Sequence, residues 1–239
     1  MASTLDQLLL VQERDTALDR LRHRREALPA RSELAAREAD VANHSARVNE
    51  LTKERDEVLA EERRLDDEAT SLETRAKEVE QRLYSGTVAS PRELQAMQAD
   101  IDMLQRHRSE IEDRELEVME RREQLDQDLT VAQNAFNDAT AEAERLRGVI
   151  TEQEREIDAE IAVESEARAT HMVGLPERLL GDYERRRARN RGAGVARLVG
   201  DTCQGCHLSI PSTEVERIRR GPEGTVAYCD NCGCILVPA

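Results

Sequence analysis

Apolar residues recur every seven positions through most of the first 165 residues of the chain. From Leu34 to Leu83, two interleaved sets of positions, each advancing by seven residues, are mostly apolar. The same repeat returns from Leu94 to about Glu164. A sustained seven-residue repeat is typical of α-helices that pack along a narrow left-handed seam. The pattern therefore predicts two long helices.

The segment between the two repeats has the composition of a turn. Ser85-Gly86-Thr87 interrupts the helical pattern. Ser90 and Pro91 then resemble the start of a helix, with Ser90 as the cap and Pro91 at the first helical position. We therefore expect the chain to reverse direction over residues 84–90.

The two repeats match each other when the chain is folded back at this turn. Facing residues of an antiparallel hairpin have a constant sum of residue numbers, and a sum of 176 or 177 places apolar opposite apolar in nearly every layer. Examples are Leu65 with Ile111 and Leu51 with Leu125. The sequence predicts one intramolecular antiparallel coiled-coil hairpin.

Two layers of this hairpin bring like charges together. Arg55 would face Arg122, and Glu62 would face Glu115. Such long side chains can extend out of a thin seam, pair with a neighbouring layer, or form a polar patch that docks a partner helix. All three alternatives are open at this point.

A shorter helix precedes the hairpin. Thr4 and Gln7 fit a capping box, and the helix is expected to run to about Leu28. Pro29 should kink or restart it, because proline cannot donate a hydrogen bond to the preceding turn. Its apolar residues are expected to continue the antiparallel pairing; Leu28, Leu21 and Leu18 would meet Ile150, Ile157 and Ile161.

The pattern changes near Gly174, which divides the chain into domains 1–173 and 174–239. A short helix should begin at 175–177, continue past Tyr183 and end at Gly192 and Gly194. A capping box from Thr213 to Glu216 should open another helix to about Arg220. A strand is predicted over 195–199 and a turn over 221–224, while residues 225–228 lead to Cys229 and residues 235–237 follow Cys232.

The C-terminal region holds two Cys-x-x-Cys pairs separated by 22 residues: Cys203 and Cys206, then Cys229 and Cys232. Zn²⁺ is typically bound in structural sites by four ligands in a tetrahedron, and each pair can deliver two thiolates with little strain. We predict a four-cysteine zinc ribbon that binds one zinc ion. Because protein thiolates fill every position, the zinc would be structural rather than catalytic.

Other interpretations of these cysteines exist. Cys203 to His207 matches the Cys-x-x-Cys-His pattern of c-type haem attachment, which would leave the second pair unexplained. A redox pair is a second alternative, although no surrounding βαβ pattern supports it. The fifth thiol, Cys234, could replace Cys232 as a ligand or remain free.

Composition limits the classes of function. Charged residues make up 36% of the chain and aromatic residues 2%, which suits long helices rather than a wide core. The net charge is −15, whereas residues 183–239 carry nine arginines and six acids. The acidic helices disfavour nucleic acid along their length. Leu8 to Val11 is too short for a signal peptide core and no apolar run would span a membrane, so we expect a cytoplasmic protein.

A run of arginines precedes the first cysteine pair. It has no acid between its first and last members and could contact phosphate or an acidic protein. A solvated helix end is the alternative, since cations favour the helix dipole there. The six residues are Arg185, Arg186, Arg187, Arg189, Arg191 and Arg197.

Three segments together resemble the bacterial coiled-coil proteins with a C-terminal C4-type zinc ribbon. They are 90–94 at the predicted turn, 175–185 in the short helix, and the two cysteine pairs ending at 232–236. The family usually has a basic residue where this chain has Cys234. The resemblance implies a helical hairpin with a zinc ribbon and a non-enzymatic role in protein or nucleic-acid binding.

No Gly-rich phosphate loop, Ser/His/Asp arrangement or isolated carboxylate pair stands out in the sequence. We therefore expect a mainly α protein, not an enzyme, in which the hairpin docks a protein partner. The ribbon and the arginine run would contact RNA, DNA or an acidic protein. The alternative is a nucleic-acid-binding regulator that acts through the ribbon. Neither a membrane nor a small-molecule substrate is expected, and the oligomeric state is left open.

Overall fold

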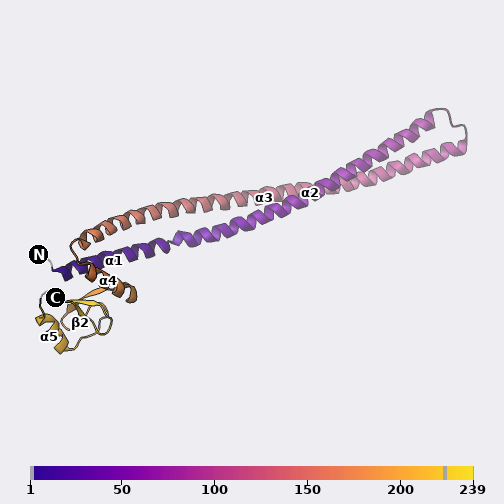
Figure 1. Cartoon of the computed structure of the whole chain (residues 1–239). Helices are drawn as coiled ribbons and strands as arrows, with labels where there is room; N and C mark the ends of the chain where they lie inside the picture. Colours follow the sequence, from indigo (N-terminus) through magenta and orange to yellow (C-terminus); the bar gives the residue numbers. More distant parts are fainter. Residues whose placement is uncertain (1–2, 223–224, 239) are drawn as a thin grey trace. The chain divides into compact units, whose positions relative to one another are not determined.

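The computed structural model describes residues 3–222 and 225–238 and is mainly helical. Figure 1 shows two long helices, α2 (Pro29–Tyr84) and α3 (Pro91–Met172), side by side. The other elements are α1 (Thr4–Glu26), α4 (Glu177–Arg189), α5 (Ser212–Arg220), β1 (Val195–Val199), β2 (Thr202–Cys203), β3 (Ala227–Tyr228) and β4 (Ile235–Pro238). The predicted fold class, a long helical hairpin with a small C-terminal sheet, is confirmed.

The chain divides into two compact units. One, which we call the hairpin unit, is Glu33–Arg145; the other, the head unit, is Met1–Ser32 together with Leu146–Ala239. This division follows contacts in space. The head unit therefore joins segments from both ends of the chain, whereas the predicted domain limits follow sequence order.

The hairpin unit buries its apolar residues in a thin seam between α2 and α3. One cluster joins Leu65 and Leu72 of α2 to Leu104 and Ile111 of α3. The next joins Leu51, Val58, Leu125 and Ala132. Both clusters combine the residues that the constant sum of residue numbers places opposite each other, so the predicted register is confirmed.

The like-charged layers are resolved by pairing between neighbouring layers. Arg122 Nη1 donates to Glu62 Oε1 at 2.6 Å and to Oε2 at 2.8 Å across the seam. Arg55 instead lies 3.0 Å from the adjacent carboxylate of Asp56. Of the three alternatives, pairing with the next layer therefore describes Arg122 and Glu62.

The turn between the long helices lies where the sequence predicts it. Helix α2 ends at Tyr84, and α3 begins at Pro91, with the Leu94 amide donating to the Ser90 carbonyl at 3.1 Å. Helix α3 continues to Met172, beyond the end of the apolar repeat near Glu164. Its last two turns therefore belong to the helix although they lack the apolar repeat.

The first helix starts and ends slightly earlier than predicted. Ser3 is the N-cap: its backbone is extended and its hydroxyl accepts from the Asp6 amide, so the capping box at Thr4 is wrong by one residue. Pro29 begins α2 and thus restarts the helix, as expected. Ion pairs join Arg24 to Glu160 and Arg25 to Asp158, so α1 does continue the antiparallel pairing with α3.

The head unit contains a four-stranded sheet in the order β2-β1-β4-β3. Strands β1 and β4 run parallel, with Val195 opposite Ile235, and the outer pairs are antiparallel. One apolar cluster joins Leu5, Leu8 and Val11 of α1 to Tyr183 of α4 and to residues of β1 and β4. The head core thus depends on α1 from the other end of the chain.

Smaller predictions for the head have mixed outcomes. Of the segment 225–228 that leads to Cys229, Ala227 and Tyr228 form strand β3. Helix α5 begins at Ser212 after Pro211 and has no side-chain cap hydrogen bond, so the capping box at Thr213 is wrong. The expected turn over 221–224 falls partly outside the described residues. No described helix is long and apolar enough to cross a membrane.

Candidate metal centre

The four cysteines of the two Cys-x-x-Cys pairs converge in the head unit. Their sulfur atoms all lie within 4.8 Å of one another. The Cys203 and Cys232 sulfurs are 3.9 Å apart, and those of Cys206 and Cys229 are 3.8 Å apart. Cys203 and Cys229 are buried, and the other two are half-buried. Both pairs therefore contribute to one cluster, as the spacing predicted.

This cluster has the dimensions that zinc requires. A tetrahedron with Zn–S bonds of about 2.3 Å has sulfur–sulfur edges of about 3.8 Å. The two sulfur–sulfur distances above match that edge. Soft thiolates in a four-sulfur set favour zinc over hard cations such as Mg²⁺. The four cysteines therefore fit a zinc ion and would fill all four of its coordination positions.

Protonation opposes metal binding at these thiols. Burial raises the pKa of Cys203 and that of Cys232, each to about 12. Burial also raises the pKa of Cys229, but hydrogen bonds from the backbone of Cys232 and Asn231 outweigh it and lower the pKa. Zinc binds thiolates, so loading the site must displace protons.

Two tight turns present the sulfur atoms. In the first, the His207 amide donates to the Cys203 carbonyl at 2.8 Å, and His207 itself has a φ of 58°. In the second, the Gly233 amide donates to the Cys229 carbonyl at 2.6 Å with a φ of 73° at Gly233. A positive φ at Gly233 carries little steric cost. We call these turns the first and second knuckles.

The fifth cysteine lies outside the four-sulfur cluster. Cys234 is buried, and its sulfur is 3.4 Å from the Ala193 carbonyl oxygen and 3.6 Å from the Asn190 amide nitrogen. Burial raises the pKa of its thiol. The structure therefore places Cys234 as a packed thiol behind the second knuckle.

Helix α4 supports the second knuckle from outside. Asn190 donates to the Cys232 carbonyl, and Arg186 donates to the Gly233 carbonyl. The Arg186 guanidinium also lies 3.8 Å from the centre of the Tyr228 ring and 2.9 Å from Asp182. Burial raises the pKa of the Asp182 carboxyl, but hydrogen bonds, chiefly from Arg186, lower it overall. Outer contacts of this kind orient metal ligands.

A buried carboxylate joins α4 to α1. Asp15 is 3% exposed and accepts from the Tyr183 hydroxyl at 2.6 Å and from Arg168 at 2.7 Å. Arg187 lies 3.8 Å from the same carboxylate. Burial, followed by the hydrogen bond to Asp15, raises the pKa of Tyr183. We call these four residues the Asp15 network.

The six arginines of the predicted run do not form one open patch. Arg186 and Arg187 are half-buried. Arg186 donates to the Gly233 carbonyl of the second knuckle, and Arg187 forms an ion pair with Asp19. Arg185 is 3.3 Å from Asp182, and Arg197 is 3.6 Å from Asp6. Within the described part of the chain, Arg189 and Arg191 are exposed and lack an acidic partner. The structure thus separates members with a packing role from those that face solvent.

Comparisons with known proteins agree with this architecture. The model of the CT398-like coiled coil hairpin domain matches residues 11–191, and that of the C4-type zinc ribbon domain matches residues 202–236. An uncharacterized protein of Mycobacterium tuberculosis is 31% identical over 236 residues, covering 96% of this chain and 93% of its own length.

Solved structures share the fold along the whole chain. A Mycobacterium smegmatis structure superposes with a TM-score of 0.86 at 24% identity and covers 100% of both chains. CT398 from Chlamydia trachomatis gives a TM-score of 0.72 at 18% identity, covering 99% of this chain and 98% of its own. At these identities the likeness concerns the fold alone.

Proposed function

Because this chain belongs to the CT398-like coiled-coil hairpin family and carries a C4-type zinc ribbon, we propose that it is a non-enzymatic adaptor. It binds partner proteins, and one zinc ion held by Cys203, Cys206, Cys229 and Cys232 keeps its head folded. The zinc is structural. Binding to partners is the task of the surrounding surface.

The observation that carries this proposal is that the candidate metal centre is closed and built into the packing of the head. Four thiolates leave no coordination position for water or substrate, which distinguishes structural from catalytic zinc. The backbone carbonyls of Cys232 and Gly233 are occupied by Asn190 and Arg186. A metal enclosed in this way stabilises a scaffold rather than performing chemistry.

The hairpin unit offers the larger surface for partners. Residues 33–145 contain 30 acidic and 16 basic residues, which gives a net charge of −14 out of −15 for the chain. Most of these side chains are exposed along α2 and α3. A strong field of one sign accelerates encounter with partners of the opposite charge. Basic protein surfaces are therefore the favoured partners of the hairpin unit.

The test is cross-linked affinity capture of the full chain from its source organism, repeated after nuclease treatment. We expect a small set of proteins to be enriched in both samples, and one zinc per chain in the purified protein. Loss of every partner after nuclease treatment, or no reproducible enrichment, contradicts the adaptor function. A robust catalytic turnover abolished by one polar substitution contradicts its non-enzymatic part.

A nucleic-acid-binding regulator is the second candidate, and the exposed, unpaired Arg189 and Arg191 of the described chain favour it. Titration of RNA and DNA oligonucleotides at low salt tests this candidate. Affinity that vanishes when Arg185, Arg189 and Arg191 become Glu supports it. Affinity that is absent, or unchanged by these substitutions, excludes it.

A further inference from the structure

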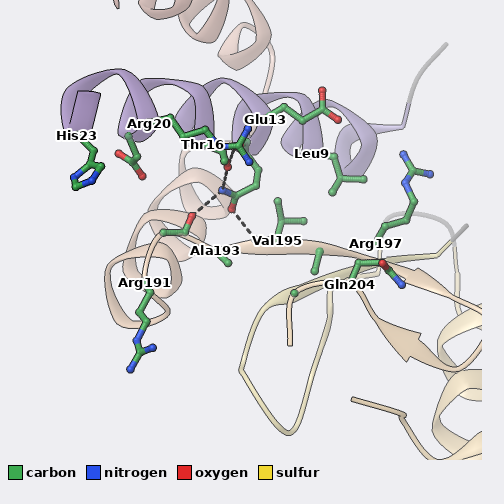
Figure 2. A pocket seen from close by; sticks show the side chains of 15 residues that line it. Leu9, Glu13, Thr16, Arg20, His23, Arg191, Ala193, Val195, Arg197 and Gln204 are labelled. Atoms are coloured by element: carbon green, nitrogen blue, oxygen red, sulfur yellow. Dashed lines mark hydrogen bonds between the residues drawn. The ribbon is translucent and has the colours of Figure 1, made fainter. Parts of the chain in front are cut away.

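A groove runs between α1 and the first knuckle, entirely within the head unit. We call it the α1–knuckle groove. Its volume is about 640 Å³, which falls in the range of about 300–1,000 Å³ that is typical of ligand sites. Leu9 and Glu13 of α1 line one side, and Val195, Arg197 and Gln204 line the other. Figure 2 shows α1 crossing above β1 with side chains from both elements facing the space between them.

Hydrogen bonds from Gln12 fix the two walls to each other. Its amide nitrogen donates to the Gly192 carbonyl at 2.7 Å, and its amide oxygen accepts from the Gly194 backbone at 2.6 Å. The same Gln12 oxygen also accepts a hydrogen bond from the Val195 backbone amide at 3.4 Å. Because one side chain bridges both walls, the groove is pre-formed, which reduces the entropy cost of binding.

The charges that line the groove are unequal. Arg20 and Arg191 have no acidic partner among the described residues, and Arg197 is held only at 3.6 Å by Asp6. Of the two acids, Asp19 already accepts from Arg187 at 2.5 Å, so Glu13 is the acid without a partner in the part of the chain that the structure describes. The groove therefore presents a surplus of unpaired positive charge, although the chain as a whole is strongly acidic.

Arg191 is held in an unusual backbone conformation. Its φ of 51° lies in the left-handed region, where glycine is favoured, and the loop from α4 to β1 nevertheless carries a charged side chain there. Figure 2 shows Arg191 and Arg197 at opposite ends of the strand-side wall, with the Arg191 side chain directed away from α1 and the Arg197 side chain directed toward the side of α1. The two cations thus lie at the ends of the groove and do not converge on one point.

From this arrangement we propose that the α1–knuckle groove binds an extended acidic segment of a partner protein. Carboxylates of the segment pair with Arg20, Arg191 and Arg197. Its apolar side chains contact Leu9 on the α1 side. This inference rests on the proposed adaptor function and names the class of partner that the head recognises.

Two other ligand classes fit less well. A single phosphate or carboxylate would need donors that converge, whereas these guanidiniums are dispersed. A single-stranded nucleic acid stacks successive bases on aromatic rings, and the groove residues include His23 but no Phe, Tyr or Trp. The carboxylates of Glu13 and Asp19 would also repel a phosphate backbone. A protein segment tolerates these acids because it offers neutral and donor groups beside its carboxylates.

The test measures fluorescence anisotropy of a labelled short peptide of alternating Glu and Leu residues, added to zinc-loaded full chain at low salt. We expect saturable binding that the double variant Arg20→Glu/Arg191→Glu weakens at least about tenfold, or about 1.4 kcal/mol. The matched control is Arg178→Glu/Arg189→Glu. It makes the same change of charge at two exposed arginines that do not line the groove.

An unchanged affinity in the control, with the loss confined to the groove variant, supports the proposal. Equal loss in both variants, or no saturable binding by the wild-type chain, overturns it. Tighter binding of an oligonucleotide with the same dependence on Arg20 and Arg191 also overturns it. Zinc content and melting temperature show that each variant is folded, and Arg20→Ala/Arg191→Ala should give a smaller loss in the same direction. If partner capture persists while peptide binding fails, the groove is wrong and the adaptor function stands.

Discussion

The hairpin unit and the head unit are stabilised in different ways. The hairpin repeats one simple contact, an apolar layer between two helices, many times along α2 and α3. The head buries its apolar residues in two compact clusters around a sheet of short strands, next to the cysteine cluster and the Asp15 network. A substitution in one layer should therefore destabilise the hairpin only moderately, whereas a substitution in the cysteine cluster or the Asp15 network should destabilise the head strongly.

The difference follows from how each unit arranges its buried residues. A long seam needs only small and medium side chains at regular spacing, and a charged layer such as Glu62 with Arg122 is tolerated within it. The ribbon spans residues 202–236 and is too short to fold on an apolar core alone. Bound zinc would compensate for that deficit, since structural zinc contributes about 10–16 kcal/mol in small peptides.

The largest effect is expected for loss of a buried ligand. Cys229→Ser should abolish zinc binding and unfold the ribbon while helical circular dichroism from the hairpin persists, because the metal supplies most of the ribbon's stability. Metal analysis together with thermal melting measures both properties. Cys234→Ala is the matched control and should keep its zinc, because Cys234 lies outside the cluster. Zinc loss in this control would contradict the assignment of ligands.

The Asp15 network should give the next largest effect. Asp15→Ala leaves Arg168 and Arg187 without their shared buried carboxylate and should cost about 3–5 kcal/mol. Tyr183→Phe removes one hydrogen bond and should cost about 1–3 kcal/mol. Urea unfolding followed through the head measures both. A smaller loss for Asp15→Ala than for Tyr183→Phe would show that the network is not centred on the carboxylate.

Tyr183 also sets the direction of a pH dependence. Its pKa is raised in the folded head, so the neutral hydroxyl is the form that the fold stabilises. That contribution is complete below the ordinary tyrosine pKa of about 10 and is lost as the pH rises above it. Wild-type head stability should therefore fall more steeply above this pH than that of Tyr183→Phe. Parallel pH profiles of the two proteins would refute the contribution.

A substitution in the seam should destabilise the hairpin unit and leave the head unit folded. Leu65 is fully buried, so Leu65→Ala should cost about 2–5 kcal/mol through lost contacts and a cavity. Zinc content should be unchanged. Hydrogen exchange along α2 and α3 would locate the loss. Release of zinc by this variant would mean that the two units do not stabilise themselves separately.

The smallest effect concerns the charged layer. Glu62→Ala leaves half-buried Arg122 without its partner and should destabilise by about 1 kcal/mol, whereas Glu62→Leu/Arg122→Leu should be neutral or stabilising. Denaturant melting of the two variants measures the difference. Strong destabilisation by the double leucine variant would indicate that the pair fixes the register of the hairpin.

Sequence reasoning works best where structure depends on local pattern. The seven-residue repeat and the constant sum of residue numbers predict the hairpin and pair Leu65 with Ile111 correctly. The spacing of Cys203, Cys206, Cys229 and Cys232 predicts the sulfur cluster without reference to anything else. Each signal can be read from one stretch of chain.

Features that depend on distant contacts could not be predicted in this way. Asp15 is one acid among many on α1, and only its meeting with Tyr183, 168 residues later, distinguishes it. Arg186 and Arg187 resembled an exposed basic run because the sequence does not show that Gly233 and Asp19 accept from them. The sequence held one signal that Asp15 is buried. Leu8, Val11, Asp15 and Leu18 follow a helical spacing, so Asp15 lies within an otherwise apolar face of the helix.

The central claim is that zinc holds the head together and is dispensable for the hairpin. Hydrogen exchange of the full chain before and after treatment with a strong zinc chelator tests it most directly. We predict that amides of β1 and β4 lose protection on zinc removal, while those of 51–72 in α2 and 101–125 in α3 keep theirs. Retained protection in β1 and β4, or simultaneous loss in both units, would contradict the claim.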